Sequence, residues 1–124
     1  MHFNESKPIY IQIADHVSDN IISRKWKEGD RIPSVRELGS ELEVNPNTVM
    51  RAFEWLTDRD IIFNKRGIGF FVNEGAYKII IANCKKNLMD NDLLDIAQSM
   101  IQLGVSLEQI NSKLETHLEA LKLK

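Results

Sequence analysis

Residues 34–56 read SVRELGSELEVNPNTVMRAFEWL and predict two short helices separated by only two residues. Ser34 begins an S-x-x-E capping box, so the first of these helices should start there and end near residue 42. Asn45 followed by Pro46 is a typical start for the second helix. Two short helices joined so tightly must cross at a steep angle, as they do in a helix-turn-helix.

Apolar residues recur at helical spacing both in this stretch and before it. In the second helix they occupy positions i, i+3, i+4 and i+7, which predicts one buried face. The same periodicity predicts an earlier helix from Pro8 to about Lys25, with Ile13, Val17 and Ile21 on its inward side. These helices together predict a small helical core.

The pattern changes after the helices. Residues 61–63 (IIF) and 70–72 (FFV) are short, apolar and rich in strand formers. Between them, residues 64–69 (NKRGIG) are basic and contain glycine, which indicates a hairpin tip. A hairpin alone is marginally stable, so it should pack on the helices. We therefore predict a mostly α fold with a small β-hairpin, in which residues 1–74 form a winged helix-turn-helix domain.

Residues 75–124 are predicted to be helical and to need a partner. Gly104 fits a helix C-cap and Ser106 begins a second capping box. The polar stretch 87–92 could kink the chain, so residues 77–103 could form one helix or two. Two helices can scarcely enclose a core, so they pack on the first domain or on a second copy. We favour the second copy and expect a helical dimerisation region.

Composition excludes several classes of protein. The hydrophobic fraction of 43% and the charged fraction of 27% are those of an ordinary globular chain. No run approaches the ~18 apolar residues of a membrane span, and the N-terminus lacks a secretory signal pattern. A single cysteine, Cys84, excludes an internal disulfide and indicates a reducing compartment. We expect a cytoplasmic protein without membrane contact, in which Cys84 is a buried thiol.

Several motifs, in order, resemble the GntR family of bacterial regulators. They are KPIYIQI at 7–13, EGDRIPSVREL at 28–38, VNPNTVMRAF at 44–53 and KRGIGFFV at 65–72. The third resembles the recognition helix of the YtrA subfamily in particular, and the match covers about residues 7–73. The resemblance implies a dimeric, repressor-like regulator that binds an inverted-repeat operator.

Three positions depart from much of the family. Arginines often stand where this chain has Pro46 and Met50, so the base contacts of those members cannot be carried over. A different operator sequence is therefore implied. Asp60 stands where glycine is more frequent, and we expect a local effect on the backbone only.

Candidate DNA contacts lie at the start of the recognition helix, residues 45–58, because the N-terminal residues of such a helix reach base edges in the major groove. Asn47 suits adenine and Arg51 suits guanine. Thr48 suits a phosphate or a thymine methyl group, or it could merely stabilise the first turn of the helix. Asn45 could contact DNA or act only as the N-cap, and Arg51 could instead form a solvated ion pair with the glutamate three residues later.

Other candidate contacts lie at the preceding helix and the wing. Arg36 opposes the helix dipole in its first turn, which favours a DNA partner, and Ser34 could add a phosphate contact although capping alone explains it. Lys65 and Arg66 suit a phosphate or the minor groove, and Gly67 lets the backbone approach, although an ordinary solvated turn is the alternative. The net charge of −2 argues weakly against nucleic acid. The case therefore rests on where these cations lie.

Three functions compete for this sequence: a sequence-specific DNA-binding homodimer, a winged helix used only for protein contact, and an enzyme. No nucleophile–base pair, metal-ligand spacing or phosphate loop occurs, so we expect no catalytic residue, cofactor or metal. The expected partners are double-stranded operator DNA and a second copy bound through residues 75–124. A small-molecule effector stays open, since a dimer interface or an interdomain cleft could hold one.

Overall fold

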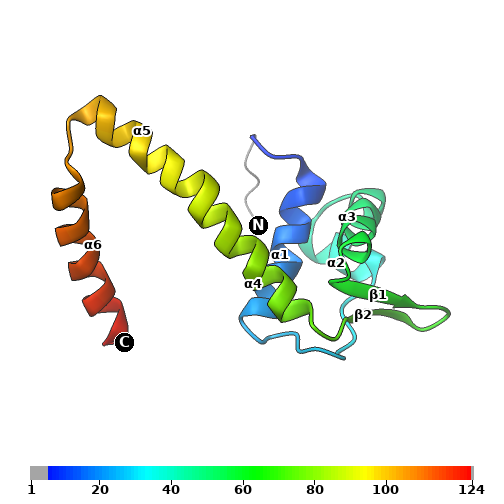
Figure 1. The fold of residues 1–124 in the computed structure, drawn as a ribbon. Coiled ribbons are helices and arrows are strands. Elements are labelled where there is room, and N and C mark those ends of the chain that lie inside the picture. The colour runs from blue at the N-terminus through cyan, green and yellow to red at the C-terminus, as the bar shows by residue number, and fades with distance from the viewer. Residues whose placement is uncertain (1–5, 124) are drawn as a thin grey trace. The chain divides into compact units, whose positions relative to one another are not determined.

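The computed structural model describes residues 6–123, and Figure 1 shows its fold. Helices α1 (Ile9–Ile22), α2 (Val35–Leu42) and α3 (Pro46–Asp58) are followed by an antiparallel hairpin of β1 (Ile62–Lys65) and β2 (Gly69–Val72). After the hairpin come α4 (Ala76–Asn87), the π-helical turn η1 (Leu88–Asp92), α5 (Leu93–Leu103) and α6 (Leu107–Lys122). The predicted fold class, mostly helical with a small hairpin, is confirmed.

The chain divides into two compact units, Met1–Asn83 and Cys84–Lys124. The sequence pattern placed the boundary earlier, between residues 74 and 75. Ala76 and Ile80 are only 0% and 3% exposed and belong to the same core cluster as residues of α1 and α3. The first turns of α4 therefore contribute to the core of the N-terminal unit.

Both predicted helix starts of the helix-turn-helix are formed by side-chain caps. The Ser34 hydroxyl accepts from the Glu37 amide at 3.1 Å, and the Glu37 carboxylate accepts from the Ser34 amide at 3.0 Å. At the start of α3, Asn45 Oδ1 accepts from the Asn47 amide at 2.8 Å. A Cβ on Gly39 would lie 3.0 Å from the Val44 carbonyl oxygen, so glycine permits the close crossing of α2 and α3.

The core of the N-terminal unit is built from one face of each helix and the inner face of the hairpin. The periodicity predicted most of it, and the predicted inward residues of α1 and α3 are at most 1% exposed. The buried apolar residues are Ile13, Ala14, Val17, Ile21, Ile32, Leu38, Val49, Ala52, Phe53, Leu56, Ile61, Ile62, Val72, Ala76 and Ile80.

The ends of α1 differ from the prediction. Pro8 is the N-cap rather than a residue of the first turn, and the helix ends at Ile22 rather than near Lys25. Arg24 has a left-handed φ of +66°, and the Trp26 amide donates to the carbonyl of Asn20 at 3.0 Å. The chain therefore folds back on the last turn instead of extending the helix.

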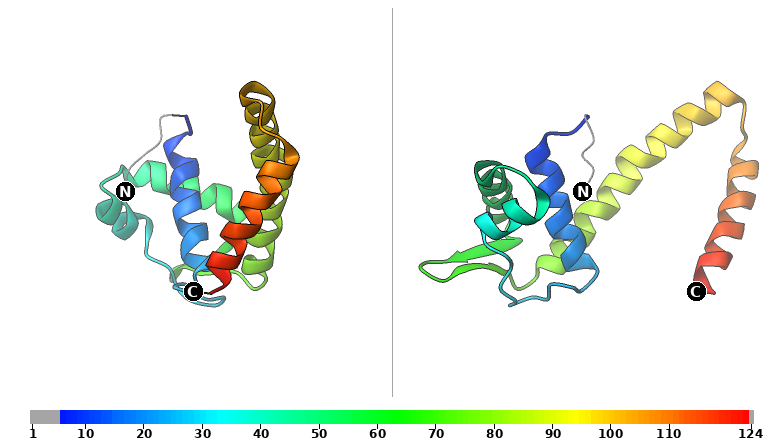
Figure 2. Two further views of the ribbon diagram at one scale, coloured as in Figure 1. Left: turned by 90° about the vertical axis from the view of Figure 1, so that its left-hand side faces the viewer. Right: turned by 180° about the vertical axis from the view of Figure 1, so that it is seen from behind.

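The hairpin pairs from Ile62–Val72 to Lys65–Gly69, so its strands extend further into the predicted tip than expected. Its inner face is tied to α3, because the rings of Phe70 and Phe53 meet edge to face with centroids 4.8 Å apart. Figure 2 shows the hairpin projecting away from these helices. Just before β1, Asp60 has a left-handed φ of +60°, which is the local backbone effect expected there.

The helical run from Ala76 to Leu103 is continuous through η1, where Asn91 donates to Asn87 Oδ1 at 2.8 Å. None of the residues of η1, α5 or α6 is buried. The prediction of a buried Cys84 is wrong: this thiol is exposed, because the buried face of α4 ends at Ile80. In the described part of the chain, no helix is long and apolar enough to cross a membrane.

Candidate nucleic-acid interface

At the start of α3, one polar side chain caps the helix and others are exposed to solvent. The side-chain oxygen of Asn45 is occupied by its cap hydrogen bond. The side chains of Asn47 and Arg51 are exposed and that of Thr48 is half-buried. Asn45 therefore acts as the N-cap. Asn47 and Arg51 face solvent from successive turns of the same helix.

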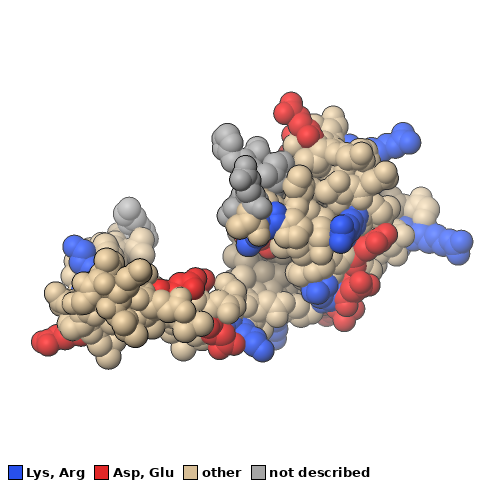
Figure 3. Space-filling view, turned by 90° about the horizontal axis from the view of Figure 1, so that it is seen from above, with Lys and Arg blue, Asp and Glu red and all other residues tan. Residues whose placement is uncertain are grey.

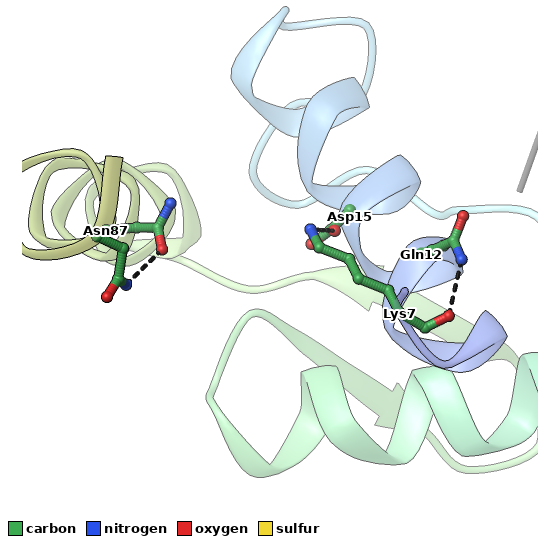
Figure 4. A network of polar contacts seen from close by, with 5 residues as sticks. Lys7, Gln12, Asp15 and Asn87 are labelled. Carbon is green, nitrogen blue, oxygen red and sulfur yellow. Dashed lines mark hydrogen bonds and ion pairs between the residues drawn. The ribbon is translucent and has the colours of Figure 1, made fainter. Parts of the chain in front are cut away.

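Arg51 does not form the alternative ion pair with Glu54. Among residues 6–123, the ion pairs join Lys7 to Asp15 at 3.2 Å and Lys122 to Glu119 at 3.9 Å; the first is shown in Figure 4. Arg51 instead places its guanidinium carbon 4.0 Å from the centroid of the Tyr10 ring, which belongs to α1. The contact is a cation–π interaction.

The start of α2 carries Arg36 on an exposed position beside the capping box. The Ser34 hydroxyl accepts within that box, so its oxygen is partly engaged. Hydrogen bonds from the Ser34 backbone and side chain, assisted by the nearby charge of Arg31, lower the pKa of Glu37 below its usual value. An ionised carboxylate therefore lies near Arg31 and directly follows Arg36 in the sequence.

The tip of the hairpin exposes Lys65, Arg66 and Gly67. The Ile68 amide donates to the Lys65 carbonyl at 2.9 Å, and Gly67 has a φ of +79° at the third position of this turn. A positive φ at that position favours glycine. Figure 3 shows basic side chains projecting at separate places from the N-terminal unit, with acidic side chains between them. On the face shown, the basic side chains form no single uniform patch.

Arg31 is a cation beside the wing that the sequence interpretation missed. It forms a β-bridge with Phe71, and the amide of the next residue, Ile32, donates to the Phe70 carbonyl at 3.0 Å. A Cβ on Gly69 would lie 3.0 Å from Arg31 Nε, so the arginine side chain lies directly on the wing backbone. Only strand pairing between distant segments places it there, and the sequence signal was no more than an exposed cation before an apolar residue.

The described residues show no candidate metal site. Between residues 6 and 123, no group of three or more His, Cys, Asp and Glu side chains comes together. What the N-terminal unit offers is a helix-turn-helix with polar groups at the start of α3 and a basic hairpin packed on the same helix. This arrangement defines the class of winged helix-turn-helix regulators that bind DNA.

Residues 9–72 match the family described as bacterial regulatory proteins, gntR family, and the chain belongs to this family. The family description is that of regulatory proteins. The chain is 34% identical over 117 residues to the regulator YhcF of Bacillus subtilis. The aligned region covers 94% of this chain and 95% of YhcF. It is also 34% identical over 106 residues to the transcriptional repressor YtrA of Bacillus subtilis, covering 86% of this chain and 81% of YtrA.

A solved structure has the same fold. The GntR family transcriptional regulator from Listeria monocytogenes superposes with a TM-score of 0.77 at 34% identity, covering 92% of this chain and 98% of that one. The resemblance to the GntR family and its YtrA subfamily, seen in the motifs, is confirmed.

Proposed function

We propose that this chain binds an inverted-repeat DNA operator as a homodimer and represses transcription. Residues 45–58 would enter the major groove, and residues 64–69 would follow the adjacent backbone or minor groove. The observation that carries this proposal is the contact between Phe53 and Phe70, which fixes the recognition helix and the wing to each other. A preformed pair of DNA-contacting elements needs little reorganisation when it binds.

The side chains divide between base reading and backbone positioning. Asn47 and Arg51 are exposed and are proposed to read bases. The Asn47 amide has the donor and the acceptor that match adenine, and the Arg51 guanidinium has the two donors that match guanine. Phosphate or minor-groove contacts are proposed for Ser34, Arg36, Thr48, Lys65, Arg66, Gly67 and also Arg31. Asn45 is assigned to the cap, since its side-chain oxygen already accepts a hydrogen bond.

Homodimerisation through residues 75–124 is proposed from the exposed apolar side chains of this region. Ile101 is 87% exposed, and α6 carries Leu107, Leu114, Leu118 and Leu121 at 47–65% exposure. Apolar surface on this scale marks an interface rather than an ordinary surface. A second copy would cover it, and two copies would present two recognition helices to the two halves of an inverted repeat.

A hollow of about 250 Å³ between α5 and α6 is proposed to belong to this dimer contact. Ligand pockets usually measure ~300–1,000 Å³ and enclose most of the ligand. This hollow is smaller and is lined largely by apolar side chains such as Ile96, Met100 and Ile110. A partner helix is a better occupant than an effector.

The experiment that tests the proposal is selection of bound sequences from a random duplex pool at ~150 mM salt, which suppresses counterion-driven binding. Enrichment of an inverted repeat would support dimeric, sequence-specific binding. Enrichment of a single half-site would support DNA binding and argue against the dimer. If the folded protein enriched no sequence, the proposal that it binds DNA without an effector would fail. A protein partner for the winged helix would then become the leading alternative.

A further inference from the structure

The ring of Tyr10 in α1 lies beneath the guanidinium of Arg51 in α3. We infer that Tyr10 is a positioning residue, which holds Arg51 in the orientation that reads a base. This inference rests on the proposed function, because it assigns Tyr10 a role in the same interface. It adds a residue of α1 to sequence recognition, although α1 lies outside both the recognition helix and the wing.

The Tyr10 ring is a fixed platform. It is half-buried and packs against the core cluster, and Ile13 and Ala14 in the next turn of α1 are fully buried. The start of α1 has no side-chain N-cap, but Gln12 Nε2 donates to the carbonyl oxygen of Lys7 at 2.9 Å, and Lys7 Nζ pairs with Asp15 (Figure 4). Both contacts therefore link Lys7 to the first two turns of α1, which carry Tyr10.

A ring is a suitable support for an arginine that must still bind DNA. A carboxylate partner would occupy the N–H donors of the guanidinium, whereas an aromatic face attracts the charge and leaves the in-plane donors available. Arg51 has no ion-pair partner within residues 6–123. It is thus restrained in position while its hydrogen-bonding edge stays open.

A second arginine, at the C-cap of the same helix, shows the contrast. Arg59 lies over the Trp55 ring at 3.7 Å, but its Nη1 also donates to the Trp55 carbonyl oxygen at 3.0 Å. Arg59 is the C-cap residue of α3, at the end of the helix opposite to Asn47. It provides a matched stacked arginine without a proposed DNA contact.

The test compares operator binding by full-length variants, using the duplex selected above and its single-base changes. Arg51→Ala should weaken binding about 5-fold or more and relax preference at one base pair of each half-site. Tyr10→Leu should weaken it about 2- to 10-fold and relax preference at that same base pair. Tyr10→Phe keeps the ring and should restore most of the loss. The double variant Tyr10→Leu/Arg51→Ala should bind no more weakly than Arg51→Ala alone.

Controls separate positioning from a loss of folding. Arg59→Ala removes the matched pair and should leave operator affinity unchanged, and thermal unfolding shows whether Tyr10→Leu is folded at the assay temperature. In the DNA-free protein, 15N relaxation of the Arg51 Nε–H group should show greater mobility in Tyr10→Leu than in Tyr10→Phe.

Two failures are distinguishable. If the wild-type chain selects no duplex, the proposed function falls and the positioning role falls with it. If the wild-type chain selects an operator but Tyr10→Leu binds it with full affinity, or loses affinity equally for every base change, only the positioning role is overturned.

Discussion

At the scale of single residues, helix capping and the proposed base contacts fall to different, neighbouring polar side chains. Ser34 and Asn45 satisfy amides at the starts of α2 and α3. Asn47 lies two positions after Asn45 and is exposed without such a duty. Because a side chain that caps a helix has fewer groups left for DNA, sequence preference should depend on Asn47 more than on Asn45.

Asn47→Ala should cost ~1–3 kcal/mol of operator binding and relax preference at one adenine, because a bidentate base contact is lost. Fluorescence anisotropy with the operator and its single-base changes measures this. An equal loss for every duplex would place Asn47 on a phosphate instead.

Glu37 should make unfolding depend on pH in the acid range. Its pKa is lower in the folded chain than the usual value for a glutamate, mainly because the Ser34 backbone amide donates to the carboxylate. The folded state therefore gains stability above the unfolded pKa and loses it as pH falls through the folded pKa. Glu37→Gln keeps an amide oxygen for the capping box but does not titrate.

The midpoint temperature of thermal unfolding should thus fall less steeply between pH 6 and pH 3 in Glu37→Gln than in the wild type. Glu41→Gln on the same helix is the matched control and should follow the wild type. Identical slopes for Glu37→Gln and the wild type would show that the capping carboxylate contributes nothing to acid unfolding.

At the scale of elements, the recognition helix and the wing are stabilised in different ways. The start of α3 depends on a local cap, whereas the hairpin depends on packing of Phe70 against Phe53 and on pairing with the segment around Arg31. A single substitution at Asn45 can therefore destabilise the start of α3. The position of the wing depends on residues of α3 and of the segment around Arg31.

Asn45→Ala should reduce the free energy of unfolding by ~1 kcal/mol, since it leaves the Asn47 amide without its acceptor. Asn45→Ser retains a capping oxygen and should restore both stability and operator affinity. Denaturant unfolding and anisotropy measure the two effects. Full stability but lost affinity in Asn45→Ser would assign Asn45 a direct DNA contact.

Lys65→Ala should weaken binding to all duplexes alike and reduce the slope of log affinity against log salt by ~1, because one phosphate contact is lost. Lys25→Ala, an exposed cation in the loop after α1, is the control and should leave the slope unchanged. A changed base preference in Lys65→Ala would instead place this lysine among the reading residues.

At the scale of the whole molecule, the two compact units differ in how complete they are. Residues of the N-terminal unit enclose a core, whereas none of the described residues of η1, α5 and α6 is buried. Helices with a bare apolar face derive much of their stability from packing, so the proposed dimer contact would stabilise the C-terminal unit.

Leu118→Glu should disrupt the proposed dimer, because it places a charge on the apolar face of α6. Sedimentation should show monomers at concentrations where the wild type is dimeric, and affinity for a full inverted repeat should fall far more than affinity for a half-site. Thr116→Glu, on the opposite face of α6, is the control. Dimers that persist in Leu118→Glu would move the interface away from this face.

The sequence by itself predicted the elements and the family, because the signals that specify them are local. Capping boxes, the Asn45–Pro46 start and the change from helical to strand spacing each act within a few residues. The buried faces of α1 and α3 and the place of the basic turn at Lys65 to Gly67 follow from the same local patterns.

Only the tertiary structure decided which distant residues lie together. Arg31 beside the wing, Tyr10 under Arg51 and the burial of Ala76 and Ile80 join segments that no local spacing relates. The exposure of Cys84 likewise depends on where the core ends and not on its apolar neighbours. Local hydrogen bonds and periodicity specify each element, but contacts between elements depend on packing, which a single chain's spacing does not encode.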